Sequence, residues 1–207
     1  RIAVINRALT GELTDRIPDC MSLVVGRWII AVQDLMPAEI RNSPEWRGLL
    51  PFAAGTGRDY ESERLDIILD WMWGTVLPSV QPVADARGFG EEWSAMLQAR
   101  TAQKADAAAD AAADAAAAVY AADAAATADR AAADAAAVWA ATAADAAAEA
   151  AAVYAADAAA EAAAVYAADA ADAAVDAAAA WSVDDTVAAW RLFDPVGVLQ
   201  RLIEVGA

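Results

Sequence analysis

The sequence predicts an all-α protein, and three observations support this class. Residues 105–180 contain 51 alanines in 76 positions, and alanine has the highest helix propensity because ordering it costs no side-chain entropy. Apolar residues in the first hundred positions recur at helical spacing. No stretch keeps the alternation of apolar and polar residues that is typical of a half-buried strand. We therefore expect a compact helical head over 1–100, an Ala-rich array of several helices over 101–181, and C-terminal helices over 182–207 that pack back.

Two amphipathic segments dominate the head. Pro18 and Asp19 open the first, and Pro37 ends it. Its expected buried face consists of Met21, Val24, Val25, Trp28, Ile29, Val32 and Leu35. The second begins past Arg58, carries Glu61, Leu65, Ile68, Leu69, Met72 and Val76 on one side, and is weakened and ended by Gly74 and Pro78. Both segments follow the i, i+3, i+4, i+7 spacing of one buried helix face.

Shorter helices are expected around these two segments. A helix over 2–9 precedes the first, and two helical turns follow it at Pro37–Asn42 and from Ser43, where Ser43 caps and Pro44 occupies the first helical position. Helices near 79–86 and from Glu91 complete the head. Two amphipathic helices over 182–192 and 196–205 close the chain.

The Ala-rich region is an internal repeat. The unit AADAAAEAAAVY occurs twice in succession, at 143–154 and 155–166. A twelve-residue period turns the pattern by about 120° per repeat at about 100° per residue, so one straight rod would carry aromatic rings on every side. We therefore favour several packed helices, with breaks near Thr142 and Ser182, where a hydroxyl followed by an acid forms a capping pattern. A single long helix is the alternative.

Composition limits the chemistry. The chain has no histidine and one cysteine, Cys20, which excludes imidazole bases, imidazole metal sites and an internal disulfide. The better interpretation of Cys20 is a small buried residue. Its net charge of −17 repels phosphates, so direct binding to nucleic acid is disfavoured. No segment is apolar enough to span a membrane. We expect no cofactor and a cytoplasmic protein, although the chain begins at Arg1 and a signal peptide upstream would not be visible.

Two groups of residues are candidate binding sites. The first is the set of acids in the array that could contact a basic partner: Asp106, Asp110, Asp114, Asp145, Glu149, Asp157 and Glu161. The second is an anion loop made of Gly55, Gly57 and Arg58, because free N–H groups before a helix favour phosphate. Glu63, Asp66 and Asp70 share a helix face that could hold a metal, but a solvated face is the better interpretation.

The chain resembles a group of uncharacterised actinobacterial proteins with Ala-rich repeats. The resemblance lies in the head segments IPDCMSLVVGRWIIAVQDLMP, RNSPEWRGLLPFAAGTG and ERLDIILDWMW, in the AADAAA and AAVYAA units, and in the closing DPVGVLQRLIEV. Some members are loosely labelled immunity-like. The resemblance implies a helical scaffold with variable decoration.

We therefore expect a non-enzymatic structural or protein-interaction scaffold that self-associates through Ala-rich helix faces, with a protein partner or a second copy as its ligand. One alternative is an acidic decoy, either a DNA mimic or immunity-like, that binds a basic partner. Another is an ice-binding helical protein, although the threonines form no regular row. An enzyme would need its chemistry from Asp, Glu, Arg, Tyr or Cys20 alone.

Overall fold

The computed structural model describes residues 2, 7–8, 11–14, 16–101, 103–105, 107–112, 114, 142, 169, 171, 173–174 and 183–207. All regular secondary structure in these ranges is helical, which confirms the predicted all-α class. The repeat units at 143–166 and the break at Ser182 lie outside the described residues, so the choice between packed helices and one long helix stays open there. None of the described helices is both long enough and apolar enough to cross a membrane.

The first amphipathic segment forms α2 (Leu23–Leu35), with Ser22 as its N-cap and Met36 as its C-cap. The expected face is buried apart from Leu35, which is half-buried. The predicted start at Pro18 is wrong, because residues 18–22 form a turn and the helix begins only where Ser22 accepts a hydrogen bond from the Val25 N–H at 3.1 Å. Cys20 lies in this turn and is exposed, so the expected burial of its side chain is also wrong.

Two helices follow α2. The short α3 (Ala38–Arg41) comes directly after Pro37. The next helix, α4 (Pro44–Ala53), starts as predicted, since Ser43 caps it and Pro44 occupies its first position. It continues for 10 residues, through Pro51, and is therefore longer than the predicted turn.

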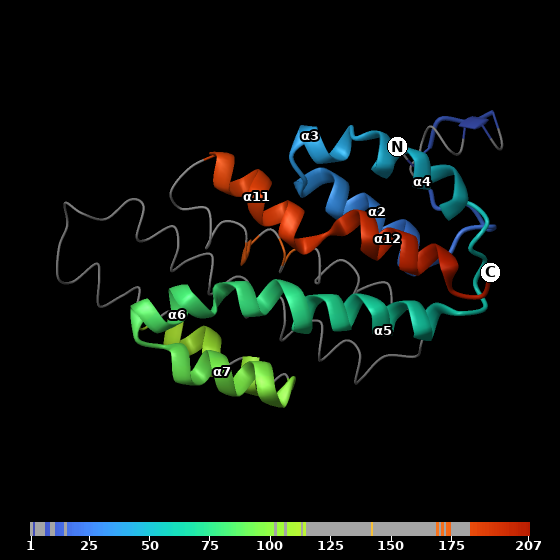
Figure 1. The fold of residues 1–207 in the computed structure, drawn as a ribbon. Coiled ribbons are helices and arrows are strands. Elements are labelled where there is room, and N and C mark those ends of the chain that lie inside the picture. The colour runs from blue at the N-terminus through green and yellow to red at the C-terminus, as the bar shows by residue number, and fades with distance from the viewer. Residues whose placement is uncertain are drawn as a thin grey trace.

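A continuous helical path then runs from Glu61 to Arg87 through α5 (Glu61–Trp71), the π-helix η1 (Met72–Val76), the 3₁₀-helix η2 (Leu77–Val80) and α6 (Gln81–Arg87). Pro78 lacks the N–H that would donate to the Gly74 carbonyl in an α-helix, so the hydrogen-bond register changes around these two residues. Gly74 and Pro78 thus interrupt the α-helix without ending the helical path. Gly88, at φ 87°, ends α6, and α7 (Gly90–Ala99) returns against it as a hairpin (Figure 1).

The C-terminal helices α11 (Val183–Phe193) and α12 (Pro195–Glu204) pack back on the head. Figure 1 shows α12 beside α2 and above α5, and it also contacts α4. Val198, Leu199 and Leu202 are each at most 1% exposed. The amino-terminal and carboxy-terminal parts of the chain therefore share one hydrophobic core.

Tryptophans form the centre of this core. The ring of Trp28 on α2 lies 6.0 Å from that of Trp46 on α4 and 5.7 Å from that of Trp71 on α5. The indole Nε1 of Trp71 donates to the Phe193 carbonyl at 2.7 Å. This bond joins α5 to the last residue of α11, across 122 positions of sequence.

Candidate functional site

The loop between α4 and α5 contains the predicted anion loop, and its N–H groups are engaged within the protein. The donors are Gly55, Thr56 and Gly57, and the acceptors are the carbonyls of Phe52 at 3.1 Å, Ala53 at 3.3 Å and Cys20 at 3.0 Å, respectively. An anion at this loop would have to compete with these bonds. Anion binding at this loop stays a prediction. The hydrogen bond from the Gly57 N–H to the Cys20 carbonyl holds the loop against the turn before α2.

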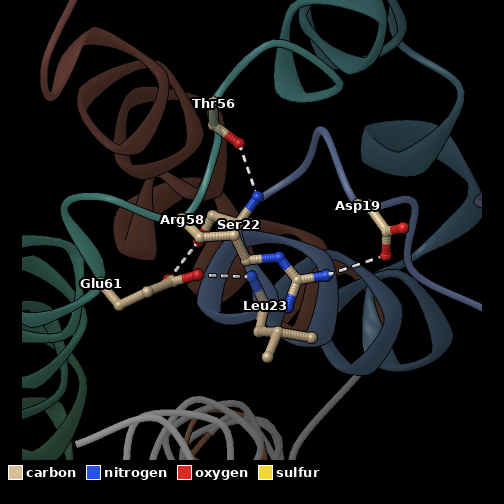
Figure 2. Close-up of polar contacts among 6 residues, drawn as sticks. All are labelled: Asp19, Ser22, Leu23, Thr56, Arg58 and Glu61. Atoms are coloured by element: carbon tan, nitrogen blue, oxygen red, sulfur yellow. Dashed lines mark hydrogen bonds and ion pairs between the residues drawn. The ribbon is translucent and has the colours of Figure 1, made fainter.

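The start of α2 is closed by a carboxylate from α5. Glu61 Oε1 accepts from the Leu23 N–H at 2.8 Å, and Oε2 accepts from the Val24 N–H at 3.3 Å and from the Ser22 hydroxyl. The backbone N–H of Ser22 donates to Thr56 Oγ1 at 2.9 Å. Figure 2 shows Glu61 and Thr56 approaching Ser22 from two different segments. A negative charge here is favourable, because the first N–H groups of a helix have no partner inside the helix and carry partial positive charge.

Arg64, one turn further along α5, is 1% exposed and connects two distant segments. Its guanidinium donates to the carbonyls of Thr56 at 2.6 Å and Gly57 at 3.3 Å in the loop. It also donates to Leu202 at 3.1 Å and Val205 at 3.0 Å at the end of α12. The last carbonyls of a helix lack partners inside the helix, so Arg64 satisfies the end of α12 and fixes the loop with one side chain.

Desolvation by burial lowers the pKa of the Arg64 guanidinium, while Glu61, then Glu63, Asp59 and Tyr60, act in the opposite direction. An arginine nevertheless stays charged at neutral pH. Both buried charged side chains, Glu61 and Arg64, have backbone groups as hydrogen-bond partners. We call Ser22, Thr56, Glu61 and Arg64 the polar junction.

Arg58, the third residue of the predicted anion loop, extends across the start of α2 toward Asp19 (Figure 2). The shortest distance between its Nη2 and the Asp19 Oδ1 is 3.9 Å, and the two side chains are 36% and 91% exposed. Exposed pairs of this kind contribute little to stability because water screens them. Arg58 is thus available to a competing anion.

The acids of the array are only partly within the described residues. Asp110 and Asp114 are helical and exposed, whereas Asp106, Asp145, Glu149, Asp157 and Glu161 lie outside the described residues. In the same helical stretch the alanines at i, i+3, i+4 and i+7 are buried: Ala105, Ala108, Ala109 and Ala112. Further along, Asp169 is exposed, although partial desolvation raises the pKa of its carboxyl, and Ala171, Ala173 and Ala174 are buried. Where it is described, the array thus has one buried alanine face, while its described carboxylates and Ala107 are exposed.

The remaining carboxylates of α5 behave as a solvated face. Glu63, Asp66 and Asp70 are exposed, and Asp70 pairs with Arg100 at 3.5 Å. Within the described ranges, no three acidic or cysteine side chains gather as they would to hold a metal ion.

Sequence reasoning missed the polar junction. Glu61 stood among the apolar residues of the predicted buried face, which was a usable signal that its carboxylate would be buried with partners. Arg64 is three residues further along the same face, so its burial was also within reach of the periodicity. Its acceptors at Leu202 and Val205 are more than 130 positions away and leave no local pattern.

Comparisons of the chain with protein-family models, with curated proteins and with solved structures return no match. The function is therefore inferred from the residues and their geometry.

Proposed function

We propose that this chain is a non-enzymatic protein-interaction scaffold whose acidic array is the contact surface. The observation that carries the proposal is the division of residues 105–114 into a buried alanine face and an exposed face with Asp110 and Asp114. Aspartates one helical turn apart project from the same face. A net charge of −17 gives such a surface a long-range attraction for cationic partners.

The polar junction gives further support to a structural role. Its Glu61 and Arg64 are buried: Glu61 accepts from backbone N–H groups and from the Ser22 hydroxyl, and Arg64 donates to backbone carbonyls. Charged groups used in this way fix the positions of α2, α5 and α12. Self-association through alanine faces receives less support, since the described alanines at 105, 108, 109 and 112 are buried within one chain.

An acidic decoy for a basic protein is the second candidate, and the same exposed aspartates favour it. The two candidates differ in what the partner's surface normally binds. A decoy competes with nucleic acid for its partner, whereas a scaffold does not.

Titration with a helical peptide that carries lysine at four-residue spacing tests the acidic surface. We expect saturable binding that weakens steeply between about 50 and 300 mM salt, because screening shortens the reach of exposed charges. The double substitution Asp110→Asn/Asp114→Asn should weaken binding about threefold to tenfold, at about 0.7 to 1.4 kcal/mol of lost attraction.

The control removes the same charge elsewhere. Glu91→Gln/Glu92→Gln takes two exposed acids from the first turn of α7, and it should leave the affinity within twofold of the unaltered chain. Equal losses in the two double variants would mean that net charge alone attracts the peptide, and the proposed surface would be abandoned. Light scattering of the same samples reports the mass, and a stable dimer through the array would replace the proposed hetero-partner with a second copy.

A further inference from the structure

A pocket lies beside the start of α2, and its lining is basic although the chain is strongly acidic. Its volume is about 350 Å³, and six residues line it: Arg16, Ile17, Asp19, Leu23, Arg27 and Arg58. We call it the basic pocket. Three arginines and one aspartate give the lining a positive charge, in contrast to the −17 of the whole chain. We propose that the basic pocket binds a small organic anion through a phosphate or carboxylate group.

The arginines come from three separate segments and converge. Arg16 precedes the turn before α2, Arg27 lies one turn into α2, and Arg58 lies in the loop between α4 and α5. Leu23 and Arg27 are four residues apart on one helix, so they share a face. Figure 2 shows Arg58 crossing this part of the helix beside Leu23. Segments distant in sequence thus direct cationic groups to one place.

The floor of the pocket is closely packed, and hydrogen bonds hold the loop beside it. Ile17 is 6% exposed and lies so close to Gly26 that a Cβ there would be 2.8 Å from its side chain. The loop that carries Arg58 is held by the Gly57 N–H, which donates to the Cys20 carbonyl, and by Thr56 Oγ1, which accepts from the Ser22 N–H. Binding therefore requires little ordering of the backbone, and preorganisation of this kind favours affinity.

The chemistry of the lining indicates the class of ligand. A guanidinium offers a planar pair of donors that matches a carboxylate or a phosphate. The first N–H groups of α2 are already bound to Glu61, so the arginine side chains supply the recognition. Ile17 and Leu23 give one apolar wall, and the volume is near the lower end of the range of small-molecule sites, about 300 to 1,000 Å³. A compact anion with a short apolar portion suits these walls.

Asp19 competes with an incoming anion for Arg58. Its carboxylate lies 3.9 Å from Arg58 and is 91% exposed, so an incoming anion can displace it at little cost. Removing its charge should strengthen anion binding, which is a result that a purely structural Arg58–Asp19 pair would not give.

Two anions serve as probes in an amide NMR titration of the full chain, namely pyrophosphate for phosphate chemistry and citrate for carboxylate chemistry. We expect saturable shifts at the amides of Leu23, Arg27 and Arg58 with at least one of them. Arg27→Gln and Arg58→Gln should each weaken that binding about tenfold, the loss of one charge-assisted hydrogen-bonding group. Asp19→Asn should strengthen it about twofold to fivefold.

The matched control is Arg201→Gln, which removes an exposed arginine from α12 outside the pocket. It should bind the probe as the unaltered chain does, and circular dichroism should show equal helicity in all four variants. Equal weakening in the Arg201 and Arg58 variants, or the lack of saturable shifts with both probes, would overturn the proposal. The acidic surface of the array is not involved, so failure of one proposal leaves the other standing.

Discussion

Gly26 and Ile17 show how one missing side chain can determine a local structure. Gly26 lies inside α2, where glycine normally costs about 0.5 to 1 kcal/mol relative to alanine. Here a Cβ would be 2.8 to 2.9 Å from three carbon atoms of Ile17. Because Ile17 is buried and β-branched, it has little freedom to move away. The glycine therefore permits the contact that closes the turn onto the helix.

We predict that Gly26→Ala destabilises the protein by about 1 to 3 kcal/mol, the usual range for overpacking a tight site. Urea unfolding followed by tryptophan fluorescence measures the change. The control is Gly48→Ala in α4, where no atom lies within 4 Å of the added methyl, and it should stabilise the protein by up to about 1 kcal/mol.

A second substitution identifies the cause of the loss. Ile17→Ala removes the opposing side chain, so Gly26→Ala made on that background should cost much less than it does in the unaltered chain. If Gly26→Ala raised the free energy of unfolding as Gly48→Ala does, the close contact with Ile17 would not be the reason for the glycine.

Helix α5 connects the elements of the head through charged side chains rather than through apolar packing alone. Its first residue, Glu61, caps α2, and Arg64 binds the end of α12 and the preceding loop. One turn of α5 thus sets the positions of two other helices. Such groups are costly to bury, and they are stabilising only while all their partners are present.

We predict that Arg64→Lys destabilises the protein by about 2 to 4 kcal/mol, because an ammonium cannot reach four carbonyls in the two directions that the guanidinium spans. Backbone amide hydrogens at the end of α12 should then exchange faster with solvent than those in α2 and α5. Arg201→Lys, an exposed change on α12 itself, should stay within about 0.5 kcal/mol of the unaltered chain.

Uniform acceleration of exchange, with no preference for the end of α12, would contradict the bridging role of Arg64. In that case the guanidinium would contribute only to global stability.

The same elements show which parts of the fold the sequence predicts. Ser43 and Pro44 act within one turn, and the start of α4 was predicted correctly from them. The sequence pattern predicts the start of α2 at Pro18 and gives no sign of Leu23, because the acceptor for the first N–H groups, Glu61, comes 38 residues after Leu23. The basic pocket was missed for the same reason, since Arg16, Arg27 and Arg58 have no common motif and meet only in the folded chain. Local chemistry predicts helices, whereas their ends and sites depend on distant partners.

In the molecule as a whole, α11 and α12 complete the hydrophobic core of the head. α12 buries Val198, Leu199 and Leu202 against the head and supplies two acceptors to Arg64, while α11 supplies the carbonyl that binds Trp71. Ion pairing between Arg191 on α11 and Glu39 on α3 adds a contact at the surface. The predicted boundaries at 100 and 182 divide the sequence by composition, but residues on both sides of the array contribute to one core.

Removal of residues 195–207 tests whether the head is complete without them. We predict that the shortened chain loses cooperative unfolding and the near-ultraviolet signal of its tryptophans, because three buried aliphatic side chains, each contributing about 1.5 to 3 kcal/mol, leave the core together. Leu202→Ala in the full chain should cost about 2 to 5 kcal/mol, whereas Leu192→Ala, at a side chain that is 73% exposed, should cost little. A shortened chain that still unfolds in one sharp transition would instead show that the rest of the protein folds without α12. Helix α12 would then be an addition to it, and the bonds from Arg64 to Leu202 and Val205 would dock this helix without being needed for the core.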